Sequence, residues 1–119
     1  MKKILIIITF LTLLSCSVTP VKNNASVQTG WIDEDTYTVK ADDKTEEGAI
    51  DRAQHQILKD IVDVRMRNNS RYTDIVKIRE EFEVPLVNGV IISRMKTPEG
   101  LTIYYQIRDK GLKEKFQRR

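Results

Sequence analysis

The sequence predicts an α+β domain in which a long helix packs on a small antiparallel sheet. One segment, residues 43–67, repeats apolar side chains every three or four positions, as a helix with one buried face does. Two other segments, residues 35–41 and 101–107, alternate apolar and polar side chains, as half-buried strands do. A helix laid across one face of a sheet buries both apolar faces. The expected order is strand, helix, helix, strand, strand and short helix.

The first strand is expected at Asp35–Ala41, where the chain has just passed Gly30 and Trp31. Alternation with a period of two over this length is typical of a strand with one face in the core. The apolar face carries Tyr37, Val39 and Ala41.

The long helix is expected to begin near Asp43, because Asp43 and Glu46 have the spacing of a capping box. Arg65 and Arg67 suit its last turn, where basic groups interact favourably with the helix dipole. Asn68–Asn69 then provides a left-handed stop. The apolar positions of the helix are Ala49, Ile50, Ala53, Ile57, Leu58, Ile61, Val62 and Val64.

The segment 73–84 favours a second, shorter helix, because its apolar residues also recur at helical spacing. Pro85 biases Val84 away from helical angles, so this helix is expected to end there. The stretch Ile75–Ile78 would equally pair as a strand, and the sequence leaves that alternative open.

A β-hairpin is expected from Val90–Met95 and Leu101–Ile107. The four residues Thr97-Pro98-Glu99-Gly100 place proline second and glycine fourth, as in a type I turn. Gly111 then interrupts the strand pattern, and Leu112–Gln117 is expected to form a short terminal helix.

The amino-terminal segment has the pattern of a bacterial export signal. Lys2 and Lys3 precede the apolar run Ile4–Leu14, which is too short for a spanning helix and suits a signal peptide. The run ends in Leu13-Leu14-Ser15-Cys16, which resembles the lipobox of bacterial lipoproteins. Cleavage is therefore expected between Ser15 and Cys16.

The resemblance implies that Cys16 carries a diacylglyceryl group and an N-acyl chain such as palmitate. Two or more acyl chains give stable membrane anchoring, whereas one binds marginally. The expected organisation is a signal peptide at 1–15, a lipidated cysteine with a flexible tether at 16–29, and one domain at 30–119. Ser17 stands where many bacteria read aspartate as an inner-membrane signal, so the outer membrane, facing the periplasm or the cell surface, is favoured.

Charge and cysteine content restrict the function further. Without Lys2 and Lys3, the basic residues fall from 20 to 18 against 17 acidic residues, so the net charge falls from +3 to +1. A nucleic-acid-binding domain needs a basic face, and this balance does not favour one. The basic tail from Lys113 to Arg119 fits a solvated helix face, or contact with anionic lipid or a partner. Cys16 is the only cysteine, so no internal disulfide can form.

Several short motifs of the domain together resemble those of a known family. They are Gly30-Trp31, Ala49, Arg52-Ala53, Ile57-x-x-Asp60-Ile61 and Tyr104-Tyr105-Gln106-Ile107. These residues resemble the twenty-kilodalton outer-membrane lipoprotein family, whose domain looks related to the amino-terminal domain of flagellar assembly protein T. The resemblance implies an accessory module of the envelope without enzymatic chemistry, and it implies no catalytic residue.

No catalytic or metal-binding pattern stands out. His55 is the only histidine and is expected on the solvent side of the long helix. With Cys16 committed to lipid, no Cys/His pair remains for nucleophilic catalysis or zinc. The acidic residues 33–35 and 42–43 lack the spacing of a calcium loop, so a solvated edge and a helix cap are favoured. Neither a cofactor nor a metal is expected.

Trp31 and Tyr104 are the candidate partner contacts. The two rings are expected either to form an exposed patch or to cover the edge of the domain. The sequence therefore favours a lipid-anchored, non-enzymatic interaction or structural module that binds an unidentified envelope protein. The alternative is an envelope lipoprotein that binds a small molecule or glycan on the face of the hairpin.

Overall fold

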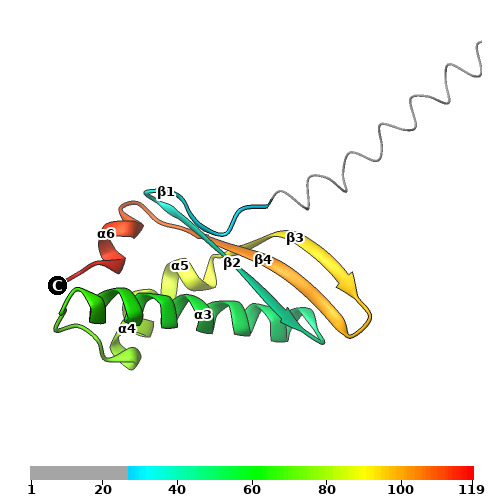
Figure 1. Cartoon of the computed structure of the whole chain (residues 1–119), viewed down its shortest axis with the longest axis horizontal. Coiled ribbons are helices and arrows are strands. Elements are labelled where there is room, and N and C mark those ends of the chain that lie inside the picture. The colour runs from blue at the N-terminus through cyan, green and yellow to red at the C-terminus, as the bar shows by residue number, and fades with distance from the viewer. Residues whose placement is uncertain (1–26) are drawn as a thin grey trace, which may run out of the picture.

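A computed structural model of the chain describes residues 27–119, and the predicted α+β fold is confirmed. One long helix lies across one face of a four-stranded antiparallel sheet, and three short helices lie around it (Figure 1). The strand order is β1-β2-β4-β3. The elements are β1 (Gly30–Asp33), β2 (Thr36–Asp43), α3 (Glu46–Arg67), α4 (Ile75–Glu81), α5 (Glu83–Val87), β3 (Val90–Thr97), β4 (Gly100–Arg108) and α6 (Leu112–Phe116).

The strand β1 is absent from the sequence prediction. It pairs antiparallel with the start of β2, where Gly30 lies opposite Thr38 and Trp31 opposite Tyr37. Its four residues are too few to show the alternation by which a strand is recognised. Gly30 has a φ angle of 89°, a conformation that only glycine adopts readily, so the chain changes direction as it enters β1.

The centre of the sheet is formed as the sequence predicts. The strand β2 pairs with β4 along its full length, from Thr36 opposite Arg108 to Asp43 opposite Leu101. The hairpin of β3 and β4 closes at Thr97 and Gly100. The register of β3 shifts between Ile91 and Ser93, which is the mark of a β-bulge.

The N-cap of the long helix lies two residues after the predicted one. Thr45 is the N-cap, and its hydroxyl accepts a hydrogen bond from the N–H of Gly48 at 3.0 Å. Asp43 is instead the last residue of β2 and pairs with Arg52 of α3. At the other end, Asn69 has the predicted left-handed conformation, with a φ angle of 57°.

The segment after the long helix is helical, which decides the alternative that the sequence left open. Asp74 caps α4 by accepting a hydrogen bond from the N–H of Val76 at 2.9 Å. The helix α4 ends at Glu81, before Pro85 as expected. A second short helix, α5, includes Val84 and Pro85, so the expectation that Val84 leaves helical angles is wrong. Pro85 lies in the first turn of α5, where backbone N–H groups have no helical partner and the missing one costs little.

The core lies between α3 and the sheet. Ala49, Ala53, Ile57 and Ile61 of α3 are fully buried, and Gln54, although only partly buried, hydrogen-bonds Tyr105 of β4. No helix within residues 27–119 has the length and apolar composition needed to cross a bilayer. The buried apolar residues are Val39, Ala41, Ala49, Ala53, Ile57, Leu58, Ile61, Ile78, Phe82, Leu86, Ile103, Tyr105, Ile107, Leu112 and Phe116.

Candidate functional site

The residues predicted to carry the lipid anchor, Ser15 and Cys16, lie outside the part of the chain that the structure describes. The two candidate partner contacts, Trp31 and Tyr104, lie within it. Neither of these two side chains is fully buried, and the sheet register decides where each one points.

Trp31 and Tyr104 lie on opposite faces of the sheet, so they do not share one patch, which was one of the two arrangements that the sequence left open. Trp31 lies opposite Tyr37 and packs against the rings of Tyr37 and Phe116, at centroid distances of 4.6 and 4.7 Å. Tyr104 lies opposite Lys40, on the face that points away from α3. Trp31 therefore covers the edge of the core between β1 and α6, whereas Tyr104 is half-exposed on the outer face.

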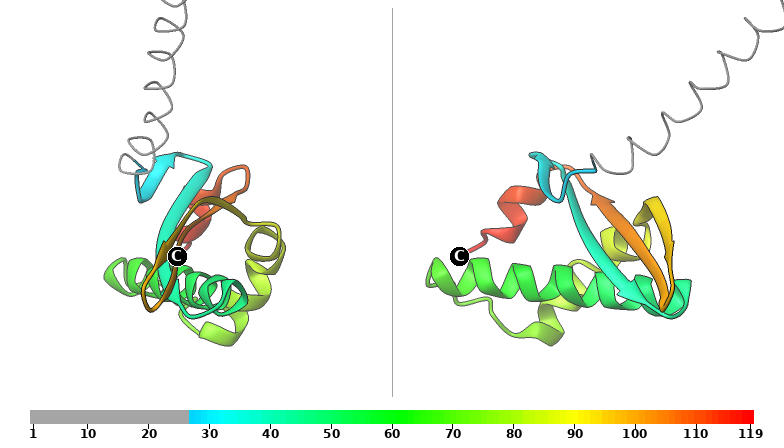
Figure 2. Two further views of the ribbon diagram at one scale, coloured as in Figure 1. Left: turned by 90° about the vertical axis from the view of Figure 1, so that its right-hand side faces the viewer. Right: turned by 45° about the vertical axis from the view of Figure 1, so that its right-hand side comes forward.

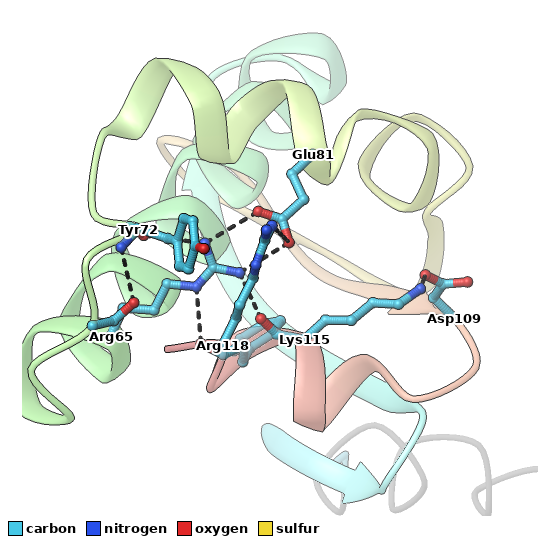
Figure 3. Close-up of polar contacts among 8 residues, drawn as sticks. Arg65, Tyr72, Glu81, Asp109, Lys115 and Arg118 are labelled. Atoms are coloured by element: carbon cyan, nitrogen blue, oxygen red, sulfur yellow. Dashed lines mark hydrogen bonds and ion pairs between the residues drawn. The ribbon is translucent and has the colours of Figure 1, made fainter.

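The densest polar cluster surrounds Arg65, whose side chain is fully buried (Figure 3). Its guanidinium donates to both carboxylate oxygens of Glu81, at 3.1 and 3.0 Å. It also donates to the backbone carbonyls of Tyr72, Lys115 and Phe116. These contacts use all five N–H donors of an arginine, so none is left for a ligand.

The Arg65 cluster holds distant segments of the chain together. It joins the end of α3 to the loop after it, to α4 and to the last residues of α6. Arg118 extends the cluster, because its guanidinium lies 4.0 Å from the ring centre of Tyr72 and 3.5 Å from Glu81. A pocket of about 610 Å³ borders this cluster, but its basic and acidic side chains nearly balance. We therefore assign the cluster to folding.

The predicted place of Arg65 in the last turn of α3 is confirmed, but its burial was not predicted. The missed signal is its spacing: Ile57, Ile61 and Arg65 follow one another at four-residue intervals, which places Arg65 on the buried stripe. Val62 and Val64, counted among the apolar positions, are only partly buried.

His55 has the expected exposed position, with 57% of its side chain accessible. Its Nδ1 lies 2.9 Å from the carbonyl oxygen of Asp51, and its Nε2 lies 3.4 Å from a guanidinium nitrogen of Arg79. Among residues 27–119, no group of three or more His, Cys, Asp or Glu side chains is arranged to hold a metal ion.

A groove of about 490 Å³ lies between β2 and α3 and is the candidate functional site. One wall is the stretch Lys40–Asp42 of β2, and the other is formed by Arg52, His55, Gln56 and Lys59 of α3. The helices α4 and α5 lie on the β3 side of α3, so neither covers this groove (Figure 2).

The strand wall of the groove is an unpaired sheet edge. The strand β1 pairs only with Thr36–Thr38, so no strand of the described chain lies beside residues 39–43 of β2. Backbone N–H and C=O groups of alternate residues point away from β4 along such an edge and can bond to an added strand.

More basic than acidic side chains line the groove. Lys40, Arg52 and Lys59 line it against one carboxylate, Asp42, which accepts a hydrogen bond from the Thr102 hydroxyl. Arg52 pairs with Asp43 at 3.0 Å, whereas Lys40 and Lys59 form no ion pair with another residue of the described chain.

A hydrogen bond joins the sheet to α3 next to the groove, through Asp60, which also contacts the lining residue Gln56. The hydroxyl of Tyr37 donates to Asp60 at 2.6 Å, and Gln56 donates to the other oxygen of the same carboxylate at 2.8 Å. Burial, together with this bond to a carboxylate, raises the pKa of Tyr37. Tyr37 is therefore a neutral donor at physiological pH.

At the opposite edge of the sheet, an ion pair joins β3 to α3. Arg94 donates to Glu46 in the first turn of α3 at 2.8 Å, and this guanidinium lowers the pKa of Glu46. In the described chain, the strand β3 pairs only with β4, so its other edge is open. The bulge and charged side chains interrupt this edge.

Comparison of the chain with protein families, curated proteins and solved structures found no match. The resemblance to the twenty-kilodalton lipoprotein family therefore stays a prediction.

Proposed function

We propose that this chain is a bacterial lipoprotein whose domain is a non-enzymatic interaction module of the cell envelope. The observation that carries the proposal is the segment Leu13-Leu14-Ser15-Cys16, which directly follows a basic start and an apolar run. Cys16 is the attachment point of the lipid, and Ser17 favours the outer membrane.

The surface of the domain supports an interaction role. The sheet has two open edges, the whole of β3 and residues 39–43 of β2. Val90, Ile92 and Met95 of β3 are 54%, 43% and 42% exposed. Open strand edges and exposed apolar side chains are features by which proteins bind one another.

The same surface offers little for catalysis. In the described chain, Arg65 has the most polar contacts and is satisfied by Glu81 and by backbone carbonyls, while Glu81 accepts from Arg65 and lies beside Arg118. His55 faces solvent without a nucleophile beside it. A binding partner is therefore favoured over a chemical substrate.

The membrane anchor is tested by expressing the full chain and its Cys16→Ala variant in a bacterium. We expect the full chain to stay in the membrane fraction after a carbonate wash and the variant to be lost from it. Ser17→Ala is the matched control and should behave as the full chain. Equal retention of Cys16→Ala would contradict the lipid anchor.

The interaction role is tested separately by crosslinking in cells, followed by mass spectrometry. Recovery of one defined envelope complex is the expected result. Recovery of the chain without any crosslinked protein, at a crosslinker dose that captures a known envelope complex, would contradict it.

A further inference from the structure

We propose that the groove between β2 and α3 binds an extended acidic peptide segment of a partner protein, which adds as a strand to the free edge of β2. The inference rests on the proposed interaction role and names the chemistry of the partner. It does not depend on the lipid at Cys16.

The sheet geometry makes room for such a strand. Were β1 to continue in register beyond Gly30, residues 27–29 would lie opposite Val39–Ala41. The left-handed conformation of Gly30 turns the chain instead, and the structure assigns no strand to residues 27–29. Within residues 27–119, the edge beside residues 39–43 therefore lies open.

The length of the open edge sets the size of the segment. It runs from Asp43, which is paired with Arg52, to Thr38, which is paired with Gly30. At about 3.3 Å per residue, these positions accommodate roughly four to five residues of extended peptide. Beyond Thr38, β1 occupies this edge of β2.

Charge selects the kind of peptide. Lys40, on the outer face of β2, and Lys59 of α3 both line the groove without an ion-pair partner in the described chain, and Arg52 adds a third cation. Carboxylates on the peptide would pair with these side chains, and charge-assisted hydrogen bonds are stronger than neutral ones.

The same charges argue against the tether as the occupant. The tether before β1, residues 17–29, contains Lys22 and no acidic residue, so it lacks the carboxylates that the groove selects.

The inference is tested by fluorescence anisotropy on the full chain in nonionic detergent. The probe is a fluorescein-labelled hexapeptide of alternating glutamate and valine. One comparison peptide has lysine in place of glutamate, and another has N-methyl groups at alternate backbone nitrogens, which block strand pairing. We expect binding of the glutamate peptide, weakened by salt, and a loss of at least about tenfold in affinity for both comparison peptides.

The matched variants locate the binding. The double variant Lys40→Glu/Lys59→Glu should lose at least about tenfold in affinity for the glutamate peptide. The control Lys77→Glu/Lys96→Glu makes the same charge change on one helix and one edge strand outside the groove, and it should bind as the wild type does. Melting temperatures of both variants should match the wild type, so that lost binding is not lost folding.

Several results would overturn the inference. They are absence of binding at about 1 mM glutamate peptide, equal affinity for the N-methylated peptide, or equal loss in the control variant. A dimer whose dissociation is promoted by Lys40→Glu/Lys59→Glu would assign the edge to a second copy instead. Because none of these readouts involves Cys16, failure here leaves the lipid-anchor test untouched, and the reverse also holds.

Discussion

Two polar side chains, Arg65 and Tyr37, join α3 to segments far away in the sequence. Arg65 reaches Phe116, and Tyr37 reaches Asp60. A buried charged group is expensive unless it is fully paired, and the cluster of Glu81 and three carbonyls satisfies Arg65. These directional contacts hold α3 in place against β2 and α6, which apolar packing alone would not do.

Replacing Arg65 by methionine should strongly destabilise the domain. The variant leaves Glu81 with Arg118 alone and removes the donors to three carbonyls, for a cost of about 3 kcal/mol. Urea unfolding measures the change. Arg67→Met, two residues on in the same turn but exposed, is the control and should cost much less. Equal stability of Arg65→Met and Arg67→Met would refute the structural role.

The Tyr37–Asp60 bond should make stability depend on alkaline pH. The pKa of Tyr37 is raised above its ordinary value of 10.0, so the folded chain holds this proton more tightly than the unfolded chain. The stabilisation is therefore fully present below pH 10 and falls as the pH rises through the raised pKa. Tyr37→Phe lacks this contribution.

Denaturant unfolding of the wild type and of Tyr37→Phe, repeated from about pH 8 to 11, measures that contribution. We expect the wild type to be the more stable at the lower pH and its advantage to shrink above pH 10. An advantage that stays constant across the whole range would exclude the proposed titration.

At the scale of elements, α3 is capped by Thr45, which the sequence pattern did not single out. Asp43 and Thr45 both have side chains that cap helices, and the spacing to Glu46 favoured Asp43. The pairing of β2 with β4 continues to Asp43, so Asp43 is held in the strand and Thr45 becomes the cap. Long-range strand pairing therefore decided where the helix begins.

Thr45→Ala should lower the stability of the domain by about 1 kcal/mol, because the N–H of Gly48 loses its side-chain acceptor. Thr45→Ser keeps the hydroxyl and should stay close to the wild type. Thermal unfolding compares the three chains. Were Thr45→Ala and Thr45→Ser to melt together, the assigned cap would be wrong.

At the scale of the whole molecule, the sequence predicted the layers but not the site. Periodicity identified α3, β2 and the hairpin, because a helix or a strand with one buried face must repeat its apolar residues. The strand β1 was too short to repeat, and Pro85 lay where a helix tolerates it.

The groove could not be predicted because it depends on where strands stop pairing. Lys40 and Lys59 lie in different elements, and nothing in their local sequence shows that they line one groove. Register also separates Trp31 from Tyr104, which sequence reasoning had brought together. Such information arises only when the sheet is assembled.

The central claim is that Cys16 anchors this domain to a membrane, and mass spectrometry of the mature amino terminus tests it most directly. The full chain is expressed in a bacterium, purified from membranes and digested, and the peptide that carries Cys16 is analysed. The account predicts a chain that begins at Cys16 and carries a diacylglyceryl group. An unmodified Cys16, or a mature chain that begins at another residue, would contradict it.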